Sequence, residues 1–218
     1  MIRPVFPRVF ALAAVVLAFA AHAAESDLSA NVRLLNAARN GDVVGVERCL
    51  KEGASADSMS RIGETALVMA LKKKDDATAR AMLAAGTDVN IAAVNGTTAL
   101  MAAAYTGDAE MVQALLARGA SISATDRLGK NAMTYAAGQG HTAVVRVLLE
   151  KGVDANAVYK NDLTALMWAA GYGRDETVKA LLDAGARTDL RDNRGKTAED
   201  IAREGGYAKT VSLLERGK

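Results

Sequence analysis

Apolar and polar positions alternate along this chain in blocks that repeat every 33 residues. In one block, Ala99 to Ala104 forms an apolar run that ends at Gly107. A second apolar group, Met111-Val112 and Leu115-Leu116, follows at the spacing of one helical face and ends at Gly119. Each block therefore predicts two short helices joined by a tight turn.

Glycine marks three positions of the block along the chain. The end of the second helix carries Gly53, Gly86, Gly119, Gly152 and Gly185. The start of the block carries Gly63, Gly96, Gly129 and Gly195, with Asp162 in the remaining place. The turn between the helices carries Gly41, Gly107, Gly140, Gly173 and Gly206, with Lys74 in the remaining place. A fixed period of this length indicates a stack of identical supersecondary units.

The predicted helices carry polar residues suited to helix ends. Thr98 stands before the first helix of its block, where a side-chain oxygen accepts a hydrogen bond from an unpaired backbone N–H. The second helix opens with acids such as Asp108 and closes with bases such as Arg118, which complements the helix dipole. The positions equivalent to Thr98 hold Thr65, Asn131, Thr164 and Thr197.

These motifs resemble the ankyrin repeat. The likeness rests on Gly-x-Thr-Ala-Leu-Met-x-Ala-Ala-x-x-Gly, then Val-x-x-Leu-Leu-x-x-Gly, then Asp88-Val89-Asn90 or Asp154-Ala155-Asn156. It covers residues 30 to about 216 and implies an all-α fold, an ankyrin-repeat solenoid of stacked helix-turn-helix units with hairpin-like loops. We expect one domain over 24–218, with units at about 30–60, 61–93, 94–126, 127–159, 160–192 and 193–216. The polar variants at both ends are expected to cap the stack.

Lys74 departs from the family pattern at the turn between two helices. Glycine is the usual residue there because it adopts positive φ without steric cost. A lysine forced to positive φ costs roughly 1 kcal/mol, so we expect this turn to be either strained or shaped differently. The surrounding charge run, Lys72 to Asp76, is interpreted as a solvated turn, with a partner contact as the alternative.

The first 23 residues have the features of a secretory signal peptide. Arg3 and Arg8 precede an apolar run of 12 residues, Val9 to Ala20, and Ala21-His22-Ala23 provides a small-x-small cleavage site. An uncleaved membrane anchor is the alternative, but the run is shorter than the ~20 residues that span a bilayer. We expect cleavage after Ala23 and a bacterial protein of the periplasm or the cell exterior, without stable membrane insertion.

Removing the signal peptide changes the charge balance. It takes away Arg3 and Arg8 and leaves 25 basic and 25 acidic residues, so a net charge near zero gives no support for nucleic-acid binding. The lone Cys49 falls at the phase of buried leucines and is interpreted as a core residue, with a reactive thiol as the alternative. It leaves no internal disulfide.

The sequence predicts no catalytic, cofactor or metal site. Gly138 to Ala143 matches a dinucleotide fingerprint, but a helical segment precedes it where that fingerprint needs a strand. One His and one Cys in the mature chain cannot form a metal cluster, and we assign His141 a structural role at the start of a second helix. We therefore expect no enzymatic activity.

The resemblance implies that binding uses the loop tips and the concave face of the first helices. The mature chain's aromatic residues gather at those phases and are absent from the core phases, and tyrosine and tryptophan dominate binding hot spots. The alternative for any single aromatic residue is that it packs between adjacent units and has no binding role. The predicted partner-binding residues are Tyr105, Arg127, Leu128, Lys130, Tyr135, Tyr159, Lys160, Leu163, Trp168, Tyr172, Arg194 and Lys196.

This surface combines an aromatic centre with a basic rim, which favours a protein partner with an acidic patch over phosphate or lipid headgroups. We expect a monomeric interaction module that serves as an accessory, scaffold or protective partner of a periplasmic protein. The alternative is an inhibitor or immunity protein that neutralises an exported toxin or lipase.

Overall fold

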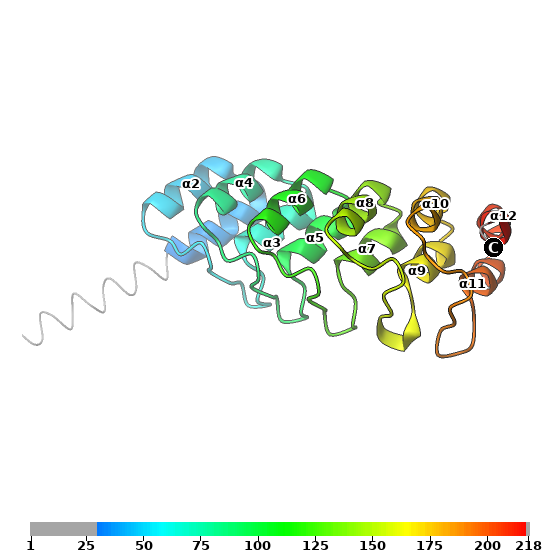
Figure 1. The fold of residues 1–218 in the computed structure, drawn as a ribbon. Coiled ribbons are helices and arrows are strands. Elements are labelled where there is room, and N and C mark those ends of the chain that lie inside the picture. Colours follow the sequence, from blue (N-terminus) through cyan, green and yellow to red (C-terminus); the bar gives the residue numbers. More distant parts are fainter. Residues whose placement is uncertain (1–29, 217–218) are drawn as a thin grey trace, which may run out of the picture.

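The computed structural model describes residues 30–216, which form two layers of short helices with loops projecting from one side (Figure 1). The first helices of the blocks are α3 (Ala66–Lys73), α5 (Ala99–Thr106), α7 (Ala132–Gln139), α9 (Ala165–Gly171) and α11 (Ala198–Glu204). The second helices are α2 (Val43–Lys51), α4 (Asp76–Ala84), α6 (Ala109–Ala117), α8 (Thr142–Glu150), α10 (Asp175–Asp183) and α12 (Ala208–Arg216). Residues 30–40 are helical and pair with α2.

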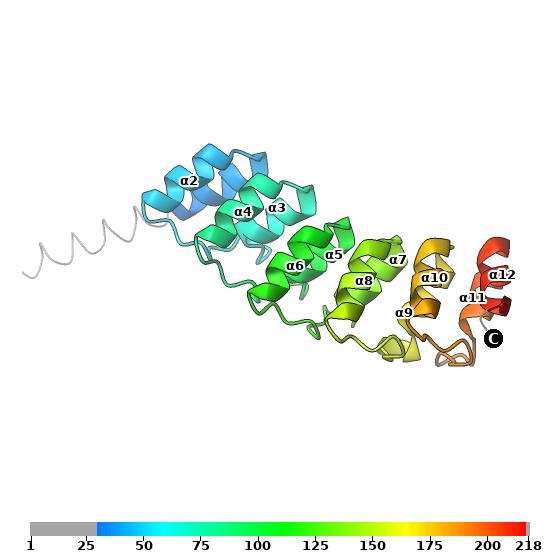
Figure 2. The same ribbon diagram turned by 45° about the horizontal axis from the view of Figure 1, so that its top comes forward.

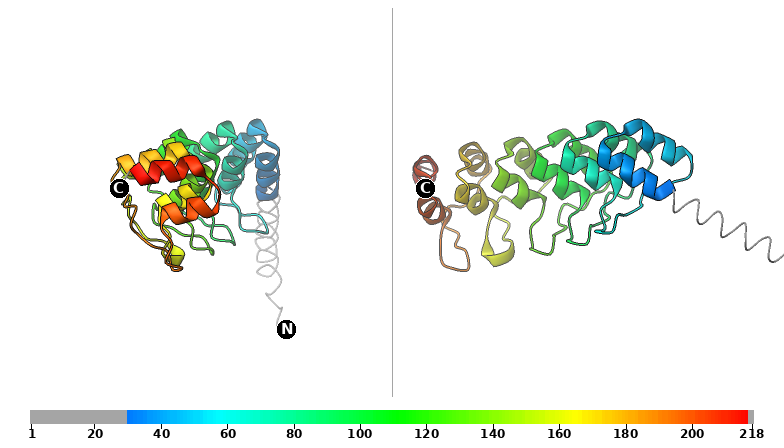
Figure 3. Two further views of the ribbon diagram at one scale, coloured as in Figure 1. Left: turned by 90° about the vertical axis from the view of Figure 1, so that its right-hand side faces the viewer. Right: turned by 180° about the vertical axis from the view of Figure 1, so that it is seen from behind.

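The helix pairs stack side by side into a gently curved solenoid (Figure 2). Seen from the end, the two helical layers and the loops form separate levels (Figure 3). Each first helix from α3 to α11 begins 33 residues after the one before it. The predicted all-α stack of helix-turn-helix units is confirmed. The division into six units stays a prediction, and the predicted signal peptide lies outside the described residues.

The predicted helix starts are formed by side-chain caps. Thr98 Oγ1 accepts a hydrogen bond from the Met101 amide at 3.4 Å, and Asn131 Oδ1 accepts one from the Thr134 amide at 3.0 Å. Thr65, Thr164 and Thr197 accept the equivalent bond at their own helices. Each cap satisfies an N–H that the helix leaves without a partner, which explains the Thr or Asn at this phase.

The core runs through the stack as one continuous apolar cluster. Leu115, Leu148 and Leu181 occupy the same repeat phase and are all fully buried. Cys49, at the same phase in α2, is also buried, as predicted. Alanine pairs such as Ala136-Ala137 have no exposed surface, because their small side chains let neighbouring first helices approach closely.

Between the two helices of a unit, the chain turns through a left-handed residue. Gly107 and Gly140 adopt φ of 82° and 83°. Lys74 adopts φ of 58° at the equivalent place, so the turn keeps the shape of its neighbours and the lysine is strained.

Lys74→Gly should therefore raise the free energy of unfolding by about 0.5–1 kcal/mol, because glycine removes the strain but makes the unfolded chain more flexible. Urea denaturation would measure the change. Lys74→Ala is the control, since it removes the charge but keeps the Cβ that causes the strain. Equal effects of the two variants would contradict this explanation.

Side chains at the start of the second helices differ between the two halves of the stack. In the first half, Asp42, Asp75 and Asp108 cap their own helices. In the second half, His141 Nε2 donates to the Tyr105 carbonyl at 2.8 Å, and Arg174 Nε donates to the Gly138 carbonyl at 3.0 Å. These bonds join consecutive units at the ends of α5 and α7.

Hairpin-like loops connect one unit to the next, and a backbone hydrogen bond closes each of them. In one, the Asp126 amide donates to the Lys130 carbonyl at 2.8 Å, and Asp126 Oδ1 also accepts from the amides of Leu128 and Lys130. Asp192 is bonded in the same way in the last loop. Within residues 30–216, no helix is long and apolar enough to cross a membrane.

Candidate functional site

Four aromatic side chains meet on the surface of three consecutive first helices. Tyr105 comes from α5, Tyr135 from α7, and Trp168 and Tyr172 from α9 and its end. The Tyr105 and Tyr135 rings pack edge to face with centroids 5.8 Å apart, and the Trp168 and Tyr172 rings stack with centroids 6.2 Å apart. Tyr105 and Tyr172 are each 50% exposed, so the cluster presents ring surface to solvent.

Lys130 joins the two aromatic pairs. Its Nζ atom lies 4.6 Å from the centroid of the Trp168 ring and 5.6 Å from that of Tyr135. Both distances fit cation–π attraction, which holds the ammonium group over the rings. Lys130 forms no ion pair with the described residues. We call Tyr105, Lys130, Tyr135, Trp168 and Tyr172 the aromatic platform.

A buried carboxylate fixes the centre of the platform. The Tyr135 hydroxyl donates to Asp126 Oδ2 at 2.6 Å, while the other oxygen of Asp126 holds the loop. Burial and this hydrogen bond raise the pKa of the Tyr135 phenol well above its ordinary value, so the ring stays neutral at physiological pH. Asp126 therefore links the shape of the loop to the position of the Tyr135 ring.

Gly138 allows the stacked rings to lie close to α7. A Cβ atom placed on it would be 3.6 Å from both the Trp168 and the Tyr172 rings. Tyr105 occupies the equivalent position in α5. The missing side chain at Gly138 thus makes space for two rings that belong to the next unit.

Three further predicted residues lie beside the platform on the loops. Arg127 and Leu128 are exposed, Leu128 by 64%, and Lys160 is exposed with its side chain against Gly129. Neither Arg127 nor Lys160 has an ion-pair partner among residues 30–216. Arg127, Lys130 and Lys160 therefore carry positive charge that no carboxylate of the described residues neutralises.

Two cations of the predicted basic rim, at its C-terminal end, form ion pairs within the chain. Arg194 binds the buried carboxylate of Asp192 at 2.6 Å, and Lys196 binds Glu204. Both cations already have a carboxylate partner within the chain. The structure thus separates these two predicted residues from the free cations around the platform.

Two predicted binding residues, both in the loop before α9, have side chains that are only partly exposed. Tyr159 and Leu163 are half-buried and pack against the core. The Tyr159 hydroxyl is buried beside Asn131 without a hydrogen bond of ordinary geometry, and burial raises the pKa of this phenol. Tyr159 takes the place that Asp126 and Asp192 hold in their loops, and its partly buried ring packs against the core. Its part in partner binding stays a prediction.

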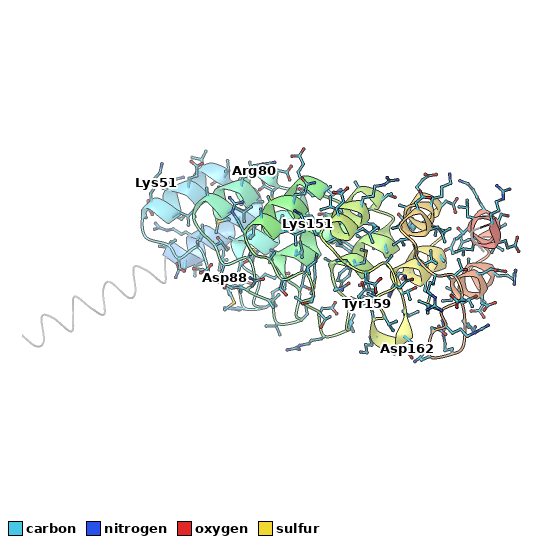
Figure 4. The ribbon with its side chains drawn as sticks, in the orientation of Figure 1. Lys51, Arg80, Asp88, Lys151, Tyr159 and Asp162 are labelled. Carbon is cyan, nitrogen blue, oxygen red and sulfur yellow. The ribbon has the colours of Figure 1, made fainter. Side chains whose placement is uncertain are left out.

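The tip of that loop is strained. Asn161 and Asp162 adopt φ of 64° and 59°, and a short 3₁₀ segment, η1 (Lys160–Asp162), replaces the usual turn. Figure 4 shows Asp162 at the tip of this loop and Tyr159 nearer the helices. Asp162 replaces the repeat glycine, and two successive left-handed residues other than glycine are costly.

The sequence reasoning missed Asp126 and Gly138 as parts of this site. Asp126 acts through a bond to Tyr135, nine positions further along, which the repeat pattern does not indicate. Gly138 contributes to the site because it has no side chain, and this leaves room for two rings of the next unit. A glycine in a sequence does not indicate such a contact. In the part of the chain that the structure describes, no three His, Cys, Asp or Glu side chains are grouped to hold a metal ion.

Comparison with known proteins agrees with this architecture. A family model described as ankyrin repeats in three copies matches residues 34–126, 74–158, 107–192 and 133–218. A mitochondrial disaggregase from Bos taurus is 39% identical over 67 residues, which is 31% of this chain and 10% of that protein. The chain thus spans about a tenth of that relative's length. Ankyrin repeats are modules for protein–protein interaction, and the overlapping matches leave little of the chain uncovered. The chain belongs to the ankyrin repeat family.

Proposed function

We propose that this protein is an exported, non-enzymatic binding module that holds or protects a periplasmic protein. The observation that carries the proposal is the aromatic platform, in which rings from three units reach solvent instead of filling the core. Exposed tyrosine and tryptophan beside a cation are the residue types on which binding energy concentrates at protein interfaces. The short match to the disaggregase does not carry that protein's activity to this chain.

The charges around the platform support an acidic partner. Arg127, Lys130 and Lys160 bring positive charge to the platform and the adjoining loops, and Leu128 adds an exposed apolar side chain between them. Such a surface attracts an acidic patch and disfavours a basic one. Apolar and aromatic contacts would then supply the affinity.

The export part of the proposal has a direct test. Expression of the full chain in a bacterium should yield a periplasmic protein that begins at Ala24, because the apolar run and the Ala21-His22-Ala23 site fit a signal peptide. Cell fractionation with mass spectrometry of the intact protein would measure this. A full-length product in the cytoplasm or the membrane would contradict it.

The binding part is tested by capture from a periplasmic extract on the immobilised mature protein. Trp168→Ala should lose the captured protein, whereas Val44→Ala should retain it, because Val44 is an exposed apolar residue of α2 outside the platform. A captured protein that both variants retain equally would contradict the proposed surface. If the captured protein is a toxin or lipase whose activity the module suppresses, the role is that of an inhibitor or immunity protein.

A further inference from the structure

The residue after the repeat glycine is charged in three units, and in two of them the charge is neutralised within the chain. Glu64 forms an ion pair with Lys72, and Lys196 forms one with Glu204. In both cases the partner lies eight residues further along, near the end of the first helix. The second and the last units therefore share one arrangement, with the signs of the charges exchanged.

Lys130 occupies the same position in the middle of the stack but lacks this partner. The residue eight positions further along is Gly138, which has no side chain. The space beside α7 is taken instead by the rings of Trp168 and Tyr172, which lie against Gly138. The Lys130 ammonium group lies over the Trp168 ring. The platform therefore holds the Lys130 ammonium group in place without a neighbouring carboxylate, whereas the equivalent Lys196 is neutralised by Glu204.

We propose that Lys130 recognises a carboxylate of the partner protein, so that a partner Asp or Glu takes the role that Glu204 takes beside Lys196. This inference rests on the proposed function, because it assumes that the partner docks on the aromatic platform. It goes further by assigning selectivity for acidic side chains to one residue and by excluding Arg194 and Lys196 from it.

Three features of the site fit this role. The aromatic rings restrict the lysine side chain before binding, which reduces the entropy lost when an ion pair forms. Trp168 and Tyr135 shield one side of the ammonium group from water, and charge pairs strengthen where water is excluded. The exposed Tyr105 and Tyr172 rings provide apolar contact for the residues around the carboxylate.

The test uses peptides as probes, selected from a random-sequence display library on the wild-type mature protein. Trp168 is the single tryptophan of the chain, so its fluorescence reports binding at the platform. We expect the selected peptides to contain an essential Asp or Glu. Lys130→Gln should weaken their binding by about tenfold or more, whereas Lys196→Gln should leave it within about twofold. Replacing the peptide's acid by its amide should abolish the difference between wild type and Lys130→Gln.

Gly138→Glu gives a second test, because it supplies the missing carboxylate within the chain. It should weaken acidic peptides more than Gly138→Gln does, because the two side chains have the same size and disturb the neighbouring rings alike, but only glutamate carries a charge. Gly138 has a helical backbone, and the first atom of a new side chain would make ordinary contacts, so we expect both variants to fold. Circular dichroism and thermal melting would verify this.

The outcomes separate this inference from the proposed function. If peptides bind at the platform and lose binding in Tyr172→Ala, but are indifferent to Lys130→Gln and contain no essential acid, the assignment of Lys130 is wrong and the platform stands. If no selected peptide changes Trp168 fluorescence or responds to any platform variant, both the inference and the proposed surface are contradicted.

Discussion

Leu148→Ala should lower the free energy of unfolding by about 2–5 kcal/mol. Leu148 lies in α8, is fully buried and belongs to the continuous core of the stack. The substitution removes apolar contacts and leaves a cavity that neighbouring helices fill only in part. Because each unit of a solenoid is stabilised mainly by its neighbours, the loss should affect the units on both sides.

Urea denaturation followed by circular dichroism would measure this loss. Val44→Ala is the control, since Val44 in α2 is 66% exposed and its truncation should change stability by no more than about 0.5 kcal/mol. If Leu148→Ala and Val44→Ala have the same stability, the repeat phase does not define the core, and the assignment of surface and interior positions fails with it.

Local chemistry made most of the fold predictable from the sequence. The glycine at each turn between helices and the Thr or Asn at each helix start act within a few residues of their own position. The 33-residue period then places equivalent residues in equivalent environments. The same reasoning predicted that the turn at Lys74 is either strained or shaped differently, and its φ of 58° decides for strain.

The details of the site depend on contacts that the period does not determine. Lys130 and Lys196 have the same phase, yet one lies over aromatic rings and the other binds Glu204. The difference comes from Gly138, whose effect appears only when the rings of the next unit are seen against it. The partial burial of Tyr159 also depends on its surroundings. Tyr159 stands where Asp126 and Asp192 close their loops, and its ring packs against the core.

Trp168→Ala should weaken binding of the captured partner by about 2 kcal/mol or more, which is about 30-fold in Kd. Trp168 makes three contacts within the site. Its ring stacks on Tyr172, lies against Gly138 and has the Lys130 ammonium group over its face. Its truncation would remove the largest ring and release both neighbours. Trp168 is half-buried, so the helical content should remain while stability falls moderately.

The most direct test of this account is the affinity of the captured partner for the wild-type protein, for Trp168→Ala and for Val44→Ala, measured by titration calorimetry on variants with verified helical content. We expect a Kd about 30-fold or more higher for Trp168→Ala and an unchanged Kd for Val44→Ala. Equal affinity of all three proteins for the partner would contradict the claim that the aromatic platform is the binding surface.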